Sequence, residues 1–468
     1  MEILHISAEC YPVAKVGGLA DVVGALPIYQ NALGSKSQVL MPFYNIAFTQ
    51  KNTFKKVYSS AIKFGEVSID FKVLTLKENT LDFDMFFIDI PELLYEKHVY
   101  AEDDTDRFLA FQIAALDWIV QLKNKPQIIH CHDYHTGLIP FMMSQCNDYK
   151  TLQRIPSVLT IHNAQYQGWF SHAKVYLIPK FDFSNVGLLD WNHTINPLAA
   201  AIKCAWRVTT VSPSYMEELK SKANGLEALV QAESSKCVGI LNGIDSEVWN
   251  PEADSYLIKT YSEKTVRSGK RDNKVWLCEE FELDPKRPLF VFIGRLVGEK
   301  GADLFPQAFR LALEHLNVSI LLLGSGMKSV ENELTRMKEP FKGIFNTYIG
   351  YNETLAHRMY AGADFLLMPS RVEPCGLNQM YSLRYGTVPV VSSVGGLKDT
   401  VIDIEKGGFG ICHKEITSEE MAKAIERAAD FYKNSKKFET TRKEIMRIDH
   451  SWDASAEQYL NLYKSLKE

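Results

Sequence analysis

Short apolar runs rich in β-branched residues recur along the first half of the chain, separated by stretches long enough for helices or hairpins. Runs of this kind are typical of strands that are buried on both faces of a parallel sheet. The pattern therefore predicts a β/α domain with a parallel sheet. Its strands are expected at residues 3–8, 39–42, 128–131, 157–161, 208–211 and 238–241.

The second half of the chain repeats this pattern, with segments of helix length such as residues 301–315 and 353–361 between its apolar runs. Alternating strands and helices predict a second doubly wound sheet, so the fold class is α/β with two Rossmann-like domains. The strands of the second sheet are expected at residues 289–293, 318–323, 347–349, 365–368 and 388–392.

A polar stretch rich in turn-forming residues, 250–284, lies between the two halves. We place the boundary near residue 245, which gives a first domain of residues 1–245 and a second of 246–450. The last segment, 451–468, should form an amphipathic helix packed on one domain, because its apolar residues have helical spacing. These residues are Trp452, Ala456, Tyr459, Leu460 and Tyr463.

Composition and charge narrow the class of protein. The 468 residues are 46% hydrophobic and 23% charged, which suits a globular chain of two domains. Acidic and basic residues are mixed and the formal net charge is −5, so we expect no nucleic-acid or membrane partner. The start, MEILHISAECYP, does not read as a signal peptide, and the eight cysteines form no CxxC pair. We therefore expect a cytoplasmic enzyme with reduced thiols.

Two groups of polar residues in the first half are candidates for ligand binding. The loop KVGGLAD, with Lys15, Gly18 and Asp21, follows the first strand and opens a helix, so its backbone N–H groups and Lys15 could hold an anion. A glycine turn without a ligand is the alternative. Asp133 and the pair His162 and Asn163 follow two further strands, where sugar hydroxyls could be bound.

The run HCHDYH around Asp133 also contains zinc-ligand residue types, but adjacent side chains on a strand point to opposite faces. We therefore expect no metal ion at this run. A structural role is the alternative for His162.

The second half adds cations and a carboxylate at strand ends. Arg295 follows the strand at 289–293, and Lys300 lies five residues later, so the two could stabilise charge on a diphosphate. Glu373 and Cys375 follow the strand at 365–368, in a turn expected to open a helix. We expect the Cys375 thiol to be the most readily alkylated, because cations and a helix N-terminus favour thiolate. Surface salt bridges and a helix cap are the alternative interpretations.

Taken together, these motifs resemble glycosyltransferase family 5, the bacterial glycogen synthases and plant starch synthases. The resemblance runs in order from residue 4 to about residue 400 and resumes near the C-terminus. The segments that carry it are KVGGLAD, HCHDYHTG, LTIHNAQYQG, RVTTVSPSY, GILNGIDSEVWNPE, GRLVGEKG, IGY, PSRVEPCGLNQMYSLRYGTVPVV and HSWDASAEQYLNLYKSL.

The resemblance implies a GT-B fold, in which two Rossmann-like domains face each other across a cleft and the C-terminal helix returns to the first domain. It implies retaining transfer of glucose from ADP-glucose to the non-reducing end of an α-1,4-glucan, with no cofactor. The first domain would bind the glucan acceptor and the second the nucleotide sugar.

The resemblance also implies roles for individual residues. His162, Arg295, Lys300 and Glu373 would be catalytic. The diphosphate would contact Lys15 and Gly18 from one domain and the turn Gly376, Leu377 and Asn378 from the other, and Asp21 would also bind substrate. Tyr351 would lie against the base. Glucose would be surrounded by Asp133, Asn163, Asn242, Glu373 and Cys375. Val16, Tyr134 and Asn378 depart from the residues most common at their positions, and Tyr134 leaves the acceptor subsite open.

The same sequence bears on several other activities. UDP-glucose as donor, or a related GT-B transferase, stays open, although relatives of the sucrose-synthase type often carry a second Glu where this chain has Tyr381. An NAD-dependent dehydrogenase is disfavoured because the motif that begins at Gly324 ends in Ser329 rather than Gly. We find no pyridoxal-phosphate lysine motif of a phosphorylase. A glucan-binding protein without activity would not need Arg295, Lys300 and Glu373 together.

Overall fold

The computed structural model describes residues 1–467 and divides into two compact units. The first unit comprises Met1–Gly243 and the segment that begins at Trp452, and the second comprises Ile244–Ser451. None of the helices in the described part of the chain has the length and apolar character needed to cross a bilayer. The two units are described separately below.

The first unit contains a nine-stranded sheet with the order β11-β10-β7-β6-β1-β2-β5-β4-β3. Pairing is parallel from β11 to β5 and antiparallel from β5 to β3. The bounds are β1 Glu2–Ile6, β2 Lys36–Pro42, β3 Phe54–Phe64, β4 Val67–Leu76, β5 Asp84–Asp89, β6 Ile128–His132, β7 Ser157–Ile161, β10 Arg207–Thr210 and β11 Cys237–Gly239.

The long antiparallel hairpin of β3 and β4 was not specified by the sequence analysis. Most side chains of β3 are exposed or half-buried, and its residues alternate between apolar and polar only in part. The search for continuous apolar runs misses such a strand, because an antiparallel edge strand can leave one face in water. The parallel strands that the runs did predict are all present, within a few residues of the expected ends.

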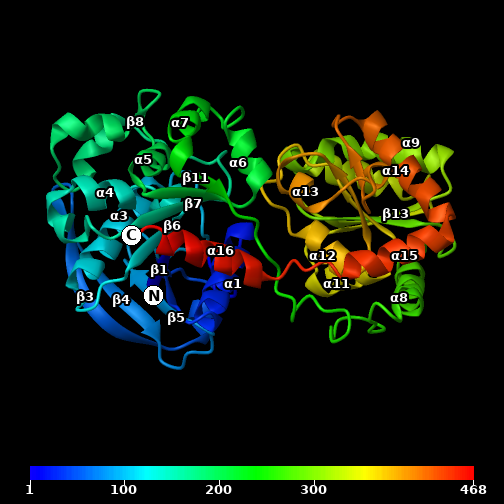
Figure 1. The fold of residues 1–468 in the computed structure, drawn as a ribbon, viewed down its shortest axis with the longest axis horizontal. Coiled ribbons are helices and arrows are strands. Elements are labelled where there is room, and N and C mark those ends of the chain that lie inside the picture. Colours follow the sequence, from blue (N-terminus) through cyan, green and yellow to red (C-terminus); the bar gives the residue numbers. More distant parts are fainter. Residues whose placement is uncertain (468) are drawn as a thin grey trace. The chain divides into compact units, whose positions relative to one another are not determined.

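The C-terminal helix α16 (Trp452–Lys464) packs on the first unit against α1 (Gly18–Ala32), as Figure 1 shows. Trp452, Ala456, Tyr459, Leu460 and Tyr463 are all buried, which confirms the predicted amphipathic helix. The other α-helices of this unit are α2 Ala47–Lys51, α3 Thr105–Gln121, α4 Ile139–Gln145, α5 Pro197–Cys204, α6 Pro213–Leu219 and α7 Glu227–Ala232, and a short strand pair joins β8 Asp190–Trp191 to β9 Thr194–Ile195.

The second unit has a six-stranded parallel sheet with the order β14-β13-β12-β15-β16-β17. Alternate side chains of β12 pack into two different apolar clusters. One cluster contains Phe290 and Phe292, and the other contains Leu289 and Val291. The sheet is therefore covered on both faces, as the doubly wound prediction requires. The strands are β12 Leu289–Ile293, β13 Ser319–Gly324, β14 Phe345–Ile349, β15 Phe365–Met368, β16 Val388–Ser392 and β17 Ile411–His413.

The stretch 250–284, interpreted as a polar connection, contains the helix α8 (Val266–Glu280). Its buried positions include Lys270, Asn273 and Lys274 among apolar residues, so polar side chains interrupt the inner face and conceal the periodicity from a search for apolar residues. The remaining α-helices of this unit are α9 Phe305–His315, α10 Lys328–Met337, α11 Glu353–Gly362, α12 Asn378–Arg384, α13 Gly395–Thr400, α14 Ser418–Lys433 and α15 Ser435–Met446.

Candidate active site

Each sheet has one point where the strand order reverses, and predicted site residues lie at both points. In the first unit the chain leaves β1 toward β2 and β5 and then returns to the other side of β1 with β6 and β7. In the second unit β12 and β15 are the corresponding neighbours. Crevices at the carboxyl ends of strands at such a reversal are the usual ligand sites of open α/β sheets.

Asp133 and His162 are brought together in the first unit. Asp133 follows β6, and its Oδ1 accepts the backbone N–H of His162, at the end of β7, over 2.7 Å. Burial raises the pKa of Asp133 to about 7. Its backbone has φ 56°, a value that few residues other than glycine adopt. A buried carboxyl with a strained backbone and a pKa near neutrality is typical of a functional position.

The side chain of His162 belongs to a buried cluster that the sequence analysis did not foresee. His5 on β1 and His130 and His132 on β6 are fully buried, and their ligand atoms lie within 4.8 Å of one another. Every ring nitrogen of these three histidines already has a hydrogen-bond partner, however, and there is no carboxylate in the group. The arrangement is that of a hydrogen-bonded network, since a metal ion would have to displace these partners.

A carboxylate lies at the glycine loop after β1. Oε2 of Glu9 accepts the N–H groups of Val16 (2.5 Å) and Gly17 (2.9 Å), and Oε1 accepts the hydroxyl of Tyr100. Burial raises the pKa of Glu9 above its usual range. In this conformation Glu9 therefore occupies two of the loop N–H groups that were expected to hold an anion. The sequence signal for Glu9 was an acidic residue among apolar ones at a strand end.

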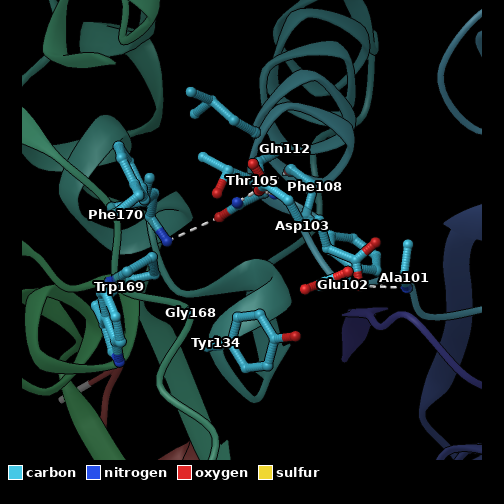
Figure 2. Close-up of a pocket in the computed structure, with 14 residues that line it drawn as sticks. Ala101, Glu102, Asp103, Thr105, Phe108, Gln112, Tyr134, Gly168, Trp169 and Phe170 are labelled. Carbon is cyan, nitrogen blue, oxygen red and sulfur yellow. Dashed lines mark hydrogen bonds between the residues drawn. The ribbon is translucent and has the colours of Figure 1, made fainter. Parts of the chain in front are cut away.

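The first unit has an aromatic pocket that is lined by Tyr134, the residue next to Asp133 in the sequence (Figure 2). Tyr134 and the exposed Trp169 line it, together with Phe108 and the acidic segment that includes Glu102. Gly168 has φ 67°, and a Cβ there would lie 2.1 Å from the ring of Tyr134. Glycine at 168 thus makes room for the tyrosine at 134, and aromatic faces beside carboxylates suit a sugar chain.

In the second unit Lys300 and Glu373 form an ion pair. Nζ of Lys300 lies 2.5 Å from Oε2 of Glu373, whose side chain is 6% exposed and also accepts the hydroxyl of Ser370. Arg295 is more open, with 56% of its side chain exposed and its ion-pair partner, Glu299, at 3.8 Å. The two cations and the carboxylate therefore occupy the reversal point between β12 and β15.

Sequence and structure comparisons identify the proteins that this chain resembles. Residues 2–232 match the starch synthase catalytic domain model, and residues 278–444 match the model of glycosyl transferases group 1. The chain is 51% identical over 466 residues to a glycogen synthase of Flavobacterium johnsoniae, covering 99% of this chain and 98% of that protein. It is 36% identical over 478 residues to a glycogen synthase of Geobacillus stearothermophilus, covering 100% and 98%.

The chain belongs to the glycogen and starch synthase family. Among solved structures, it matches the catalytic domain of starch synthase IV from Arabidopsis thaliana, bound to ADP and acarbose, with a TM-score of 0.91 and 31% identity over 100% of this chain and 99% of that one. A sucrose-phosphate synthase of Thermosynechococcus elongatus shares the fold, with a TM-score of 0.65 and 17% identity over 99% and 98% of the two chains.

Membership of the synthase family confirms the predicted glycosyltransferase and the GT-B fold and sets aside the dehydrogenase and phosphorylase alternatives. Tyr381, at the place of the second Glu in relatives of the sucrose-synthase type, stacks on Trp249 with a centroid distance of 3.8 Å. That position therefore contributes an aromatic face to packing instead of a carboxylate.

The phosphate turn expected in this synthase family member is held from two sides. Nδ2 of Asn378, the first residue of α12, donates to the carbonyl of Ile293 at the end of β12 (2.7 Å). Gly376 has φ 73°, in the region that favours glycine. A Cβ at Gly395 would lie 2.1 Å from the carbonyl oxygen of Glu373, so the glycine lets the two segments approach. Leu377 is the N-cap residue of α12.

The remaining predicted residues lie at the same edges of the two sheets. Nζ of Lys15 pairs with Oδ1 of Asp21 at 2.7 Å, and 42% of the lysine side chain is exposed. Asn163 accepts the N–H of Gln165, and the buried Oδ1 of Asn242 has no hydrogen-bond partner within the described chain. Gly18 begins α1, and Tyr351, the most exposed of the large apolar side chains at 78%, follows β14.

Cys375 differs from its predicted state. Its side chain is buried, with 4% exposure, whereas Cys204, Cys237 and Cys412 are only partly buried. This burial disfavours the fast alkylation expected for the Cys375 thiol, and the reactivity itself stays a prediction.

Proposed function

We propose that this protein transfers glucose from ADP-glucose to the non-reducing end of an α-1,4-glucan, with retention of configuration, in the cytoplasm. The observation that carries the proposal is the cluster of Arg295, Lys300 and Glu373 at the reversal point of the second sheet. The relative from Arabidopsis was solved with ADP and acarbose, which supports an adenine nucleotide and a glucan as ligands.

In the proposed reaction the bond between C1 of glucose and the diphosphate oxygen breaks, and C1 bonds to the acceptor hydroxyl oxygen on the same face. The hydroxyl proton passes to the departing diphosphate oxygen. Arg295 and Lys300 stabilise the charge that develops on this diphosphate, because they are preorganised cations. Glu373 and His162 position glucose and favour its oxocarbenium character.

The two units have distinct roles in this proposal. The second unit binds the nucleotide sugar through the turn Gly376–Asn378, with Tyr351 against the base. The first unit binds the glucan acceptor, and the aromatic pocket of Tyr134 and Trp169 supports this assignment. Lys15 and Gly18 contact the donor diphosphate, and Asp21 also binds substrate. Asp133, Asn163, Asn242 and Cys375 surround the glucose.

The test is transfer of radiolabelled glucose to glycogen by the purified chain, with ADP-glucose and UDP-glucose measured side by side. We expect ADP-glucose to be preferred. Lys300→Ala and Arg295→Ala should each lower kcat by on the order of 10²–10³, since each removes a partner of the developing charge. Lys342→Ala is a matched control, because Lys342 is exposed and precedes β14 at the opposite edge of the sheet.

A near-normal kcat in folded Lys300→Ala and Arg295→Ala would remove the cations from the reaction. Faster transfer from UDP-glucose would correct the donor and leave the transferase assignment in place. Absence of transfer from either donor would overturn the proposed function.

A further inference from the structure

A row of buried groups links α1 to the candidate site. Oε1 of the side-chain amide of Gln30, on α1, lies 2.9 Å from Nε2 of His5. Nδ1 of His5 lies 3.1 Å from Nε2 of His132, and Nδ1 of His132 lies 3.0 Å from Nε2 of His162. The row runs across three adjacent strands, β1, β6 and β7. His5 and His132 lie within their strands, whereas His162 follows the last residue of β7.

The three imidazoles of this row are neutral at pH 7. Burial lowers the pKa of His5 to about 4 and that of His162 to about 3, and it lowers the pKa of His132 as well. A neutral imidazole has one N–H donor and one nitrogen lone pair. Each ring can therefore donate on one side only, so the hydrogen bonds of the row must all point the same way.

Gln30 sets that direction, because an amide oxygen can only accept. Nε2 of His5 must carry the proton that this oxygen accepts, which leaves Nδ1 of His5 as an acceptor. Nε2 of His132 then donates to His5, and Nε2 of His162 donates to His132. The proton of His162 is thus on Nε2, and its Nδ1 has a lone pair. Among the described residues, Nδ1 of His162 has no hydrogen-bond partner.

We propose that Gln30, His5 and His132 are positioning residues that hold His162 in its Nε2–H tautomer, so that Nδ1 accepts a hydrogen bond from a hydroxyl of the donor sugar. The role of the hydroxyl rests on the proposed function, whereas the tautomer does not. Since the backbone N–H of His162 is bound to Asp133, both the ring and the main chain at this position are held. The row thereby makes Nδ1 of His162 selective for a ligand group that donates a hydrogen bond.

The tautomer can be read directly by ¹⁵N NMR of protein labelled at the histidine rings, without substrate. The resonances of His162 are identified by their loss in His162→Gln. We expect a protonated Nε2 and an unprotonated Nδ1. A protonated Nδ1, or a charged ring, would overturn the proposal, and a protonated Nδ1 would also mean that the amide of Gln30 points the other way round.

The role of the row is tested with His132→Phe, and His130→Phe is its matched control. His130 is equally buried, lies two residues earlier on β6 and stacks on His132, but its nitrogens bind Tyr463 and Thr160 instead of the row. His132→Phe should give a mixture of His162 tautomers, and His130→Phe should leave the Nε2–H form. If His132→Phe does not fold, Gln30→Met removes the accepting oxygen at the other end. An unchanged tautomer in the row variant that folds would overturn the positioning role.

The sugar contact is tested with donors that carry fluorine in place of the hydroxyl at position 3, 4 or 6. Fluorine cannot donate, so one of these donors should lower kcat/KM by about tenfold or more in the wild type. His132→Phe should reduce this discrimination, and His130→Phe should keep it. Equal discrimination in His132→Phe and the wild type would overturn the proposal. If the wild type transfers no glucose, the proposed function fails, and the NMR result still decides the tautomer.

Discussion

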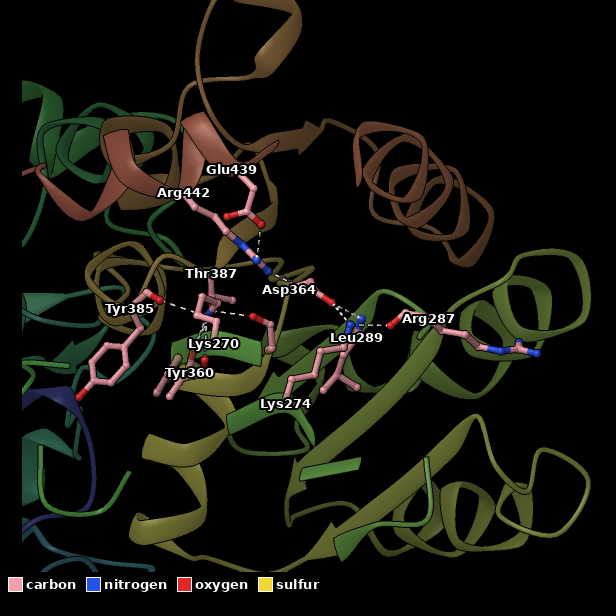
Figure 3. Close-up of polar contacts among 12 residues, drawn as sticks. Lys270, Lys274, Arg287, Leu289, Tyr360, Asp364, Tyr385, Thr387, Glu439 and Arg442 are labelled. Atoms are coloured by element: carbon pink, nitrogen blue, oxygen red, sulfur yellow. Dashed lines mark hydrogen bonds and ion pairs between the residues drawn. The ribbon is translucent and has the colours of Figure 1, made fainter. Parts of the chain in front are cut away.

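Two buried aspartates, Asp133 in the first unit and Asp364 in the second, have pKa values that are shifted in opposite directions. Asp133 follows β6, forms no ion pair within residues 1–467, and burial raises its pKa to about 7. Asp364 precedes β15 and contacts Lys274 Nζ at 2.7 Å, the guanidinium of Arg442 and the N–H of Leu289 (Figure 3). Burial would raise the pKa of Asp364 too, but the attraction of Lys274 and Arg442 outweighs it and lowers the pKa.

The difference in pKa shift corresponds to the two ends of the strands in a doubly wound sheet. Asp133 is at the carboxyl end of its strand, where ligands bind, and its charge is left without a cation. Asp364 is at the amino end of its strand, where its two cations come from α8 and α15. A buried carboxylate that is paired with cations stabilises the fold. A buried carboxyl without a cation is costly to ionise in the folded state, and it is available to a substrate.

The largest expected effect is on the paired aspartate. Asp364→Asn should lower the free energy of unfolding by about 3–5 kcal/mol, because Lys274 and Arg442 become buried cations without a counter-charge. Urea denaturation at pH 7 measures this. Asp430→Asn is the control, since Asp430 forms an exposed pair with Lys433 and should change stability by less than about 1 kcal/mol.

The pH dependence of this loss has a definite sign. The pKa of Asp364 is lower in the folded state than in the unfolded state, so the carboxylate stabilises the fold above its unfolded pKa. That stabilisation is lost as the pH falls through the folded pKa. An equal deficit for Asp364→Asn at pH 7 and well below the folded pKa would contradict the ion-pair account.

The opposite sign is expected for Asp133→Asn. Because the folded pKa of about 7 is above the usual value for Asp, ionisation costs stability as the pH rises from about 4 to 7. Asparagine avoids this cost, so the variant should be more stable than the wild type by on the order of 2 kcal/mol at pH 8, with a smaller gain at pH 5. Its kcat should fall.

Thermal unfolding at pH 5 and pH 8 measures the gain in stability, and transfer assays measure the loss of kcat. Asp89→Asn is a comparison outside the site, because burial also raises the pKa of Asp89. A variant Asp133→Asn that is less stable at pH 8 would show that the carboxylate is paired after all, and the comparison between the two aspartates would fail.

The smallest expected effect is that of chelation. Exhaustive treatment with EDTA should leave activity unchanged, because Arg295 and Lys300 supply the positive charge for the diphosphate. It should also leave the pH dependence of activity unchanged. A metal ion bound near Asp133 would lower the pKa of that carboxyl, so its removal by EDTA would shift the pH profile. Activity lost with EDTA and restored by Mg²⁺ or Mn²⁺ would require a third cation at the site.

The sequence predicted the two sheets because strands buried on both faces are continuous apolar runs. The ends of β7, β12, β15 and β16 were predicted to the residue. The hairpin of β3 and β4 and the helix α8 were missed, because the first is largely exposed and the second turns polar side chains inward. Periodicity identifies an element only when its buried face is apolar.

The candidate site was predicted less completely. Strand ends gave Asp133, Arg295 and Glu373, and their roles in the reaction remain predictions. Contacts across the sheet could not be foreseen: His5 and His132 meet across 127 positions of the sequence, and so the buried row behind His162 has no local signal. The pairing of Glu9 with the glycine loop likewise depends on how the chain closes on itself.

The return of α16 to the first unit has a consequence for the order of biosynthesis. A ribosome completes residues 244–451 before it makes the helix whose Trp452 and Tyr463 fill the core beside α1. Domains usually fold in the order of synthesis, from the N-terminus onward. Here the second unit has all of its residues first, and the nascent first unit keeps an apolar groove along α1 until translation of α16 ends.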